Sequence, residues 1–586
     1  MSAPFALLDA PGGGASLFSG LQRTLPVSAF SFPAACAEAE AAGAAGLHVV
    51  AALDYELGHL FEPASGRVPA GTLGHFWLFS ERVELAAAEL DTWLAMQAGD
   101  PPRPACIAGF APQLDAAAYE LAVARIRDYI AAGDCYQVNL TFPFAGRVVG
   151  DPFALYARLR AAQPVAHGGL VMTAEACILS FSPELFVERA GGIIRSRPMK
   201  GTAPRADDAA GDAAARVALA ASAKDRAENV MIVDLIRNDL GRIARSGSVR
   251  VESMCVVETY PSVHQMTSTV SAACDADLAT VLAALFPCGS ITGAPKVRAM
   301  QIVGELERAR RGLYTGALGW IGRGGDFRFS VAIRTLLVGA DGGLRYGVGS
   351  GIVWDSRPAA EYAECLLKAR FVTRADPGFL LIETLLLADG DYPRLALHLD
   401  RLQRSAGELG FACDREAVAA RLRAEAGRRV AGDFRVRLTL AREGELGLTI
   451  APLTATGGGL RAVLSPLRID SRSPWLGHKT TVREVYDSEL ARVSADPTVF
   501  DAIFLNERGE VGEGARSNVF VRRVAGGPLL TPPLACGLLP GVLRRQLLDS
   551  GEALEAVLYE ADLRGAAELY LGNALRGLIA VSVADA

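Results

Sequence analysis

Two kinds of hydrophobic periodicity alternate along the chain. Val123, Ile126 and Ile130 recur at helical spacing, and this pattern ends at Gly133-Asp134. The segment QVNLTFPF follows it and alternates polar and apolar residues, as a half-buried strand does. Helical patterns and short strand-like runs are interleaved throughout the 586 residues. We therefore predict a fold of the α/β or α+β class.

The clearest boundary in this pattern is the segment VTRADPG, residues 372–378. A helical pattern ends in LLKARFV, Asp-Pro-Gly then stops the helix and turns the chain, and the apolar run FLLIETLLL predicts a strand. The pattern predicts a first domain of residues 1–375 and a second of residues 379–586, each long enough to bury a core.

Composition narrows the class of protein. The 59 basic and 65 acidic side chains give a net charge of −6, and nucleic-acid binding would need clustered Lys and Arg to neutralise phosphates. No apolar run reaches the ~18 to 20 residues of a membrane helix, and the N-terminus lacks the pattern of a secretory signal. The ten scattered cysteines form no CxxC pair, as in a reducing compartment. We expect a cytoplasmic protein that binds neither nucleic acid nor membrane.

Two helical segments of the first domain each carry two acids three residues apart. SAKDRAENVMIVDL contains Asp225 and Glu228, and PAAEYAECLLKAR contains Glu361 and Glu364. This spacing places both carboxylates of a pair on one helical face. Two such pairs facing each other could hold Mg²⁺, which takes one or two carboxylates, waters and an anionic substrate. Acids are also common in the first turn of a helix, so the pattern alone leaves the metal site open.

Several single residues of the first domain admit two interpretations. Lys200, in the Pro/Gly-bounded turn RPMKGTAPR, is either a nucleophilic or charge-stabilising lysine or a solvated loop residue. His264, in SVHQMTS, is a proton carrier or a structural histidine. Arg334, in the strand-like run VAIRTL, binds either the carboxylate of a ligand or a structural partner. The segment GVGSG, residues 347–351, lacks the dinucleotide fingerprint and indicates backbone close to a ligand.

The second domain carries a lysine, an acid and a glycine-bearing turn. Lys479 lies in the polar stretch WLGHKTTVREVYD, and Glu513 lies in a Gly-flanked turn before the strand-like SNVFV. The turn at residues 537–542 enters a helix whose N–H groups could bind a phosphate, and Arg401 could add a fixed charge. Pyridoxal phosphate (PLP) needs such a set: a lysine for its aldehyde, an acid for its pyridine nitrogen and an anion cradle. Taken singly, each residue also has an ordinary structural interpretation.

The motifs of the first domain resemble those of the chorismate-utilising enzymes. DCYQVNLT, SPELF, RPMKGTAPR, KDRAENVMIVDLIRNDLGRI, SVHQMTSTV, PCGSITGAPK and GSGIVWDSRPAAEYAE occur in the order found in that family. The match covers about residues 115–372, and the first 110 or so residues resemble a short, divergent form of the family's N-terminal region. The resemblance implies a large β-sandwich-type domain with surrounding helices.

The same resemblance implies roles for individual residues. It implies that a Mg²⁺ site bridging the ring carboxylate of chorismate is formed by Asp225, Glu228, Glu361 and Glu364. It implies that a carboxylate of the substrate is held by Arg334, Tyr314 and the backbone from Gly349 to Gly351. Thr292 and His264 would line the pocket, with His264 near the departing hydroxyl. Asp225 stands where many members of the family have Glu.

Lys200 distinguishes two branches of that family. Anthranilate synthases usually carry Ala at this position, whereas aminodeoxychorismate synthases carry Lys. A lysine amine can add to ring C2 and expel the C4 hydroxyl, so that ammonia enters at C4; without it, ammonia attacks C2 and gives the other product. The resemblance thus implies an aminodeoxychorismate synthase component I. No cysteine lies in a Gly-x-Cys-x-Gly setting, which implies a separate glutaminase partner that delivers ammonia from glutamine, or direct use of free ammonia.

From about residue 379 to its end, the chain resembles class IV aminotransferase-like PLP enzymes, which have two subdomains. The signature ExxxSNVF, with Glu513, Ser517 and Asn518, follows Lys479 by 34 residues. The resemblance implies that Lys479 carries PLP and that Glu513 pairs with the pyridine nitrogen. The other implied cofactor contacts are Ser517, Asn518, and, at the phosphate, Arg401 with the backbone amides of Leu539 and Val542. Asn573, in LGNALRG, would line the cofactor or substrate side. Class IV relatives are commonly dimers, which implies a homodimer.

The PLP residues do not by themselves separate an aminotransferase from a lyase. The first domain would make 4-amino-4-deoxychorismate, the substrate of the lyase, so we predict that the second domain eliminates pyruvate and yields 4-aminobenzoate for folate synthesis. One alternative is an anthranilate- or isochorismate-type enzyme joined to an amino-acid aminotransferase. Another is a regulatory or scaffolding chain in which one half has lost its activity.

Overall fold

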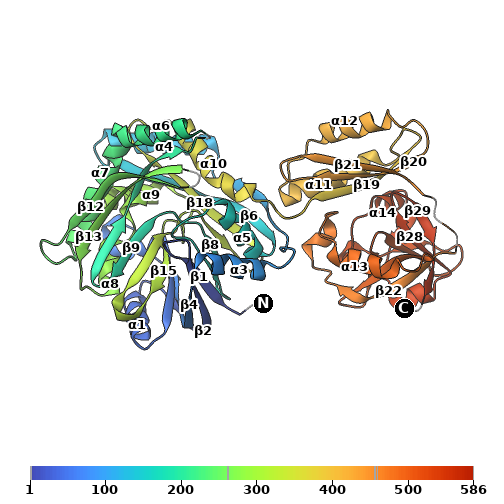
Figure 1. The fold of residues 1–586 in the computed structure, drawn as a ribbon, viewed down its shortest axis with the longest axis horizontal. Coiled ribbons are helices and arrows are strands. Elements are labelled where there is room, and N and C mark those ends of the chain that lie inside the picture. The colour runs from blue at the N-terminus through green and yellow to red at the C-terminus, as the bar shows by residue number, and fades with distance from the viewer. Residues whose placement is uncertain (1–2, 207, 261–262, 455–456, 458, 585–586) are drawn as a thin grey trace. The chain divides into compact units, whose positions relative to one another are not determined.

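The structure is a computed structural model that describes residues 3–206, 208–260, 263–454, 457 and 459–584. It divides into two compact units (Figure 1). The first contains residues up to Arg103 together with Phe110–Ala375, and the second contains Pro104–Gly109 together with the chain from Asp376 onward. The sequence assigned Pro104–Gly109 to the first domain, but the Ala105 N–H donates to the Pro377 carbonyl (3.2 Å) and ties this segment to the second unit.

Among the described residues, 18 strands are connected by hydrogen bonding, and all belong to the first unit except the first part of β5, which is counted with the second. They are β1 (Phe5–Asp9), β2 (Ala15–Val27), β3 (His48–Leu53), β4 (Gly74–Leu85), β5 (Ala105–Pro112), β6 (Gln137–Gly150), β7 (Gly169–Met172), β8 (Cys177–Ser180), β9 (Leu185–Ala190), β10 (Ile193–Arg197), β11 (Met199–Pro204), β12 (Arg250–Thr259), β13 (Val263–Ala273), β14 (Gly293–Ala294), β15 (Ala317–Ile321), β16 (Phe327–Val331), β17 (Thr335–Val338) and β18 (Gly343–Ile352). Antiparallel pairing of β6 with β18 sets QVNLTFPF beside GVGSG, and β11 and β12 both pair with β13.

The helices of the first unit carry the predicted acid pairs. They are α1 (Phe32–Ala44), α2 (Gly58–Phe61), α3 (Ala87–Ala98), α4 (Ala116–Ala131), α5 (Pro152–Ala162), α6 (Ala209–Ala221), α7 (Ala223–Gly241), α8 (Leu278–Leu285), α9 (Lys296–Leu306) and α10 (Pro358–Arg374). The Ser222 side chain caps α7 by accepting from the Asp225 N–H (3.2 Å). α7 lies against β11, β12 and β13, whereas α10 lies against β18 and α4. The two acid pairs therefore stand on helices that cover different strands.

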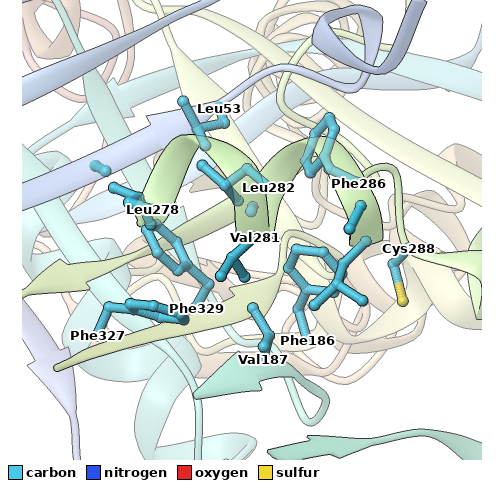
Figure 2. Packing of buried hydrophobic residues seen from close by; sticks show 14 of the residues in the cluster. Leu53, Phe186, Val187, Leu278, Val281, Leu282, Phe286, Cys288, Phe327 and Phe329 are labelled. Carbon is cyan, nitrogen blue, oxygen red and sulfur yellow. The ribbon is translucent and has the colours of Figure 1, made fainter. Parts of the chain in front are cut away.

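A large apolar cluster holds these elements together. Leu278, Val281 and Leu282 of α8 pack among Phe186 and Phe329 of the sheet, and all five are almost fully buried (Figure 2). Burying a side chain of this size contributes about 1.5–3 kcal/mol. Phe186 is the last residue of the SPELF motif. The cluster therefore anchors β9, which begins at Leu185 within that motif.

The second unit contains three separate sheets within its described residues. The first is formed by β19 (Leu381–Ala388), β20 (Asp433–Leu440) and β21 (Leu446–Pro452); the second by β22 (Arg461–Ile469), β23 (Val499–Asn506), β24 (Val511–Gly514) and β30 (Ser582–Ala584); and the third by β25 (Asn518–Arg522), β26 (Leu529–Thr531), β27 (Ala553–Glu555), β28 (Glu568–Asn573) and β29 (Gly577–Ala580). Its helices are α11 (Leu395–Leu409), α12 (Arg415–Ala426), α13 (Glu484–Val493), α14 (Val542–Asp549) and α15 (Glu560–Arg564). The mixed helix and strand content confirms the predicted fold class.

The predicted strand VAIRTL is interrupted in the structure. β16 ends at Val331 and β17 begins at Thr335. Between them Arg334 adopts a left-handed conformation with φ of 50°, which is uncommon for a residue other than glycine and cannot continue a strand. None of the described helices has the length and apolar character needed to cross a membrane.

Candidate functional sites

Lys200 stands on β11 with its amine inside the first unit. Its Nζ donates to the main-chain carbonyl of Ser290 (2.9 Å). Burial lowers the pKa of Lys200; the charge of Lys368 acts in the same direction, whereas Glu184 and Glu228 oppose it. A lowered pKa enlarges the neutral fraction of an amine, which is the nucleophilic form. The structure thus gives Lys200 an environment suited to a nucleophile.

Glu184 is a candidate that the sequence analysis did not assign. It lies in the quoted SPELF motif, is 4% exposed and accepts a hydrogen bond from the Ser290 hydroxyl (2.7 Å). Burial raises its pKa, and Lys200 and Ser290 oppose the shift. Ser290 therefore contacts both groups, through its carbonyl to Lys200 and through its hydroxyl to Glu184. The sequence signal for Glu184 is an acid placed directly before the apolar residues Leu185 and Phe186, which begin a strand.

The four predicted metal ligands are brought together only in part. Burial raises the pKa of Glu228, and the carboxylates of Asp225 and Glu361 add to the shift. Glu361 accepts hydrogen bonds from Ser356 (2.7 Å) and from Ser350. Because these groups already bind Glu361, its carboxylate is turned toward protein partners.

Glu364 is more distant from this group. It forms an ion pair with Lys368 (2.7 Å), and its side chain is 52% exposed. Within the part of the chain that the structure describes, no three His, Cys, Asp or Glu side chains are placed to hold a metal ion. The metal-binding role of the four carboxylates stays a prediction. The charges of Asp225 and Glu361 do interact with Glu228, and Mg²⁺ needs only one or two carboxylates besides water and substrate.

A glycine allows β11 to approach α7. Gly201 follows Lys200 with φ of 84°, and a Cβ at this position would lie 2.8 Å from the Cβ of Asp225. Its carbonyl accepts a hydrogen bond from Gln265 (2.8 Å). Both the left-handed backbone and the close approach require glycine here, which explains the Gly of the PMKGT segment.

Arg334 and Tyr314, predicted to hold a substrate carboxylate, both lie near Tyr346. Burial lowers the pKa of Arg334, which Tyr346 opposes, and burial raises that of Tyr314. Among the described residues no carboxylate forms an ion pair with Arg334. Its predicted binding of a substrate carboxylate stays a prediction.

The glycines of GVGSG serve packing between protein segments. A side chain at Gly347 would overlap the ring of Tyr314, one at Gly349 would lie 2.8 Å from Cγ2 of Thr141, and one at Gly351 would overlap Gln137. The missing side chains make space for protein neighbours. The predicted approach of this backbone to a ligand stays a prediction.

His264 and Thr292 are both buried with their polar atoms bound. The two ring nitrogens of His264 contact the Thr259 hydroxyl (3.1 Å) and the Asp212 carboxylate (2.9 Å). The Thr292 hydroxyl donates to the Cys288 carbonyl (2.9 Å). Because neither nitrogen of His264 is free, the structure departs from the predicted contact with the departing hydroxyl and favours a structural histidine.

The second unit contains a cavity of about 570 Å³. The residues predicted to bind PLP all contribute to its wall: Arg401, Lys479, Glu513, Ser517, Asn518, Leu539, Val542 and Asn573. They come from distant parts of the sequence: Glu513 belongs to β24 of the second sheet, whereas Asn518 and Asn573 belong to β25 and β28 of the third. The structure thus gathers the predicted set around one space.

Lys479 and Glu513 have strongly shifted pKa values. Burial lowers the pKa of Lys479 to about 7, reinforced by the charges of Arg401 and Arg483. Burial raises the pKa of Glu513 to about 7. The Glu513 carboxylate accepts from the Tyr486 hydroxyl (2.8 Å) and from the Leu539 N–H (3.0 Å). A reactive amine and a buried acid therefore face the same cavity.

The Leu539 contact corrects one prediction. Its N–H is bound to Glu513, so it is not available for a phosphate. Val542 begins α14 after Gly541, and no described side chain caps this helix. The Asn518 amide donates to the Leu539 carbonyl (3.0 Å), which fixes the turn. Of the two predicted backbone amides, only that of Val542 remains suited to binding an anion.

Arg401 is oriented by an acid that the sequence analysis did not assign. Its Nε and Nη2 donate to the two carboxylate oxygens of Glu383 (2.8 and 2.6 Å). Glu383 also contacts His398 (2.7 Å), and Arg401 with His398 outweighs burial to lower the pKa of Glu383 to about 2. Glu383 is the acid within the apolar run FLLIETLLL, a signal for a buried ion pair.

Two protein-family models match this chain, and each covers the residues of one of the two sites. The model described as chorismate binding enzyme matches residues 18–374, and the model described as amino-transferase class IV matches residues 380–584. The chain belongs to the chorismate-binding enzyme family. It also carries a class IV aminotransferase domain, so the fusion of both domains inferred from the motifs is confirmed.

The curated relatives of this chain belong to more than one branch of the family. Aminodeoxychorismate synthase component 1 of Klebsiella aerogenes is 48% identical over 242 residues, which are 41% of this chain and 53% of the relative. Anthranilate synthase component 1 of Streptomyces coelicolor is 43% identical over 270 residues, or 46% of this chain and 53% of the relative. The chain spans about half the length of the curated relatives it matches.

A solved relative agrees with the fold of the first unit. The crystal structure of anthranilate synthase component I from Streptococcus pneumoniae has a TM-score of 0.51 and 26% sequence identity, covering 63% of this chain and 90% of that chain. Branches of this family share their fold, so the fold alone does not identify the reaction. The environment of Lys200 is the feature that bears on it.

Proposed function

We propose that this chain makes 4-aminobenzoate from chorismate. The first unit replaces the C4 hydroxyl of chorismate by an amino group, and the second eliminates pyruvate from the resulting 4-amino-4-deoxychorismate. The observation that carries this proposal is Lys200: a chorismate-binding domain presents a lysine of lowered pKa beside a buried glutamate.

In the first unit, Lys200 acts as the nucleophile. Its neutral amine adds to ring C2, the two conjugated ring double bonds each shift by one position toward C4, and the C4 hydroxyl leaves as water with a proton from Glu184. Ammonia then adds at C4, both double bonds shift back and Lys200 departs from C2. Glu184 is suited to this proton transfer because Ser290 bridges it to the lysine.

The acid pairs of the two helices fit a divalent cation. Mg²⁺ held by Asp225 and Glu228 of α7 with Glu361 and Glu364 of α10 would neutralise the substrate carboxylates and assist departure of the hydroxyl. Burial is the largest cause of the raised pKa of Glu228, and the charges of Asp225 and Glu361 add to it, whereas Lys200 and Lys224 oppose it. A cation would relieve the repulsion among these carboxylates, which supports the assignment. Arg334 would bind a carboxylate at the other end of the substrate.

In the second unit, Lys479 carries the cofactor and moves protons. PLP, when bound, supplies an electron sink for charge that develops next to the substrate amine. Glu513 would keep its pyridine nitrogen protonated, while Arg401 and the Val542 amide would bind its phosphate. Lys479, when not bonded to the cofactor, would take the proton from ring C4 and protonate the methylene carbon of the departing enolpyruvyl group. Loss of pyruvate leaves an aromatic ring.

Ammonia is expected to come from a separate subunit. Several relatives are named component 1 of their synthase, which supports a partner that hydrolyses glutamine. We also propose a homodimer on the basis of the class IV resemblance.

The proposal is tested by incubating the purified chain with chorismate, Mg²⁺, PLP and an ammonium salt. Formation of 4-aminobenzoate with pyruvate supports it. Formation of anthranilate would contradict it and establish the alternative, which the similarity to anthranilate synthases favours.

Glu184→Gln is expected to slow formation of the 4-amino intermediate by ~10²- to 10⁴-fold, the usual contribution of an acid or base catalyst. Glutamine keeps the hydrogen bond with Ser290 but carries no transferable proton. The initial rate is measured as a function of pH. The variant should lack the part of the pH–rate profile in which the rate depends on protonation of Glu184. Glu252→Gln, on the exposed part of β12, is the matched control and should keep the wild-type rate and profile. An unchanged rate in Glu184→Gln would remove the proton-transfer role.

The rate at which the chain without cofactor takes up PLP should rise with pH through about 7 and then level off. Below this pKa Lys479 is protonated and unreactive, and above it the amine is neutral. An unshifted lysine, with a pKa of about 10.4, would give a rate that still rises above pH 9. Stopped-flow absorbance between pH 6 and pH 10 distinguishes the two profiles.

A further inference from the structure

Three arginines line one part of the Lys479 cavity. Arg435 belongs to β20, Arg516 lies between β24 and β25, and Arg576 lies between β28 and β29. They reach the cavity from separate segments of the second unit. None of them was assigned a function by the sequence analysis.

Protein acids offset their charges only in part: the buried Asp501 carboxylate accepts from the Arg516 main-chain N–H (3.1 Å), and its charge interacts with that of Arg516. Arg516 donates to the Phe500 carbonyl and its guanidinium lies 4.7 Å from the centre of the Phe500 ring. Arg576 donates to the Thr454 carbonyl (2.8 Å). Carbonyls and rings orient a guanidinium but leave its full charge. Of the residues that the structure describes, no Asp or Glu forms an ion pair with any of the three arginines.

Two of the four other arginines at this cavity show the contrast. Arg401 is bound by both oxygens of Glu383 (2.8 and 2.6 Å). Arg483 lies 3.4 Å from Asp487. The predicted phosphate-binding arginine is therefore already paired, whereas the wall formed by Arg435, Arg516 and Arg576 is left with excess positive charge.

The three arginines repel one another. Burial lowers the pKa of Arg576, and the charges of Arg516 and Arg435 lower it further. Placing like charges together is unfavourable unless an anion binds between them. Asn573 holds this arrangement, because its amide donates to the Arg516 carbonyl (3.2 Å) and its oxygen accepts from the Arg576 N–H (3.0 Å). Asn573 is thus a positioning residue for two of the arginines.

We propose that Arg435, Arg516 and Arg576 form a carboxylate-binding site that selects amino compounds whose carboxylate lies away from the carbon bearing the amine. This deepens the proposed function, on which it rests, by naming how the second unit would recognise its substrate. 4-Amino-4-deoxychorismate carries its ring carboxylate across the ring from the amine. An ordinary α-amino acid carries its carboxylate on the amine-bearing carbon, so the site separates lyase substrates from typical aminotransferase substrates.

Binding of the product tests the site without requiring turnover. Isothermal titration calorimetry on the full chain loaded with PLP compares 4-aminobenzoate with 4-aminobenzamide, which has the same shape but no charge. The wild type should bind 4-aminobenzoate about 10- to 100-fold more tightly, the gain expected from charge-assisted hydrogen bonds. Arg576→Met and Arg435→Met should each reduce this preference at least threefold and leave the affinity for 4-aminobenzamide unchanged.

A matched control and a second variant complete the experiment. Arg421 is a 51% exposed arginine of α12 outside the cavity wall, and Arg421→Met should keep the wild-type preference. Arg435 is exposed on its strand, so its replacement leaves the core intact; an unchanged PLP absorbance spectrum verifies this for each variant. Equal preference in the wild type and both cavity variants would overturn the proposal.

Failure of this inference is distinguishable from failure of the proposed function. If the chain forms no 4-aminobenzoate but shows the arginine-dependent preference, the carboxylate site stands and the lyase assignment falls. If the chain is an active lyase and neither variant changes the preference or the KM for 4-amino-4-deoxychorismate, the lyase assignment stands and the carboxylate site falls.

Discussion

Lys200→Ala is expected to reduce formation of 4-amino-4-deoxychorismate by at least about 10³-fold, because the variant lacks the group that becomes covalently bound to the ring. The neutral amine of Lys200 is favoured by burial and by Lys368. Alanine removes it and leaves ammonia to attack C2 directly. Any residual product should therefore be aminated at C2. Chromatography of reactions with chorismate, Mg²⁺ and an ammonium salt measures both products.

Two further variants separate the roles of Lys200. Lys200→Arg keeps a positive charge but not a nucleophilic amine, so it should be as inactive as the alanine variant. Arg237→Ala, on the exposed side of α7 (53% exposed), should keep the wild-type rate. Activity in Lys200→Arg would show that Lys200 stabilises charge and does not bond to the ring. Wild-type amination at C4 by Lys200→Ala would exclude any catalytic role.

The sequence predicted features that depend on neighbouring residues. The helix that carries Asp225 and Glu228 begins after Ser222, whose side chain caps it, and the strand-like run after Asp-Pro-Gly became β19. Such features follow from periodicity and from caps that lie within a few residues. The interruption at Arg334 was missed, since an alternating apolar pattern contains no information about a left-handed residue.

Contacts between distant residues could not be predicted in the same way. Glu184 meets Ser290 across 106 positions, and His264 meets Asp212 across 52. The first contact revealed a candidate proton donor, and the second occupied a nitrogen that the sequence analysis had assigned to the substrate. Composition and spacing identify which residues can take part in chemistry, but the fold decides which of their atoms remain free.

The two reactive lysines obtain their lowered pKa values in different ways. Burial is the largest cause for both. Glu184 and Glu228 limit the shift at Lys200, whereas Arg401 and Arg483 increase it at Lys479. A lysine beside acids can exchange protons with them, as amination at C4 requires. With a pKa of about 7, Lys479 has a large neutral fraction near pH 7, as capture of an aldehyde requires.

The second large expected effect concerns Lys479. Lys479→Ala should still convert chorismate to 4-amino-4-deoxychorismate but should form 4-aminobenzoate at least about 10³-fold more slowly, because one residue supplies both the cofactor attachment and the proton transfers. The intermediate should therefore accumulate. Chromatography follows it, and addition of an active lyase should convert it to 4-aminobenzoate.

Covalent labelling provides an independent measurement for the same variant. Borohydride reduction of the wild type with PLP should attach the cofactor permanently to the peptide that contains Lys479, and Lys479→Ala should give no labelled peptide. Arg472→Ala, an 81% exposed residue near the cavity but outside its wall, is the control and should be labelled like the wild type. Labelling at another lysine, or 4-aminobenzoate formation at the wild-type rate by Lys479→Ala, would contradict the assignment. Accumulation of the intermediate together with loss of labelling would place the two reactions in separate units of one chain, since a single residue would then stop the second reaction and spare the first.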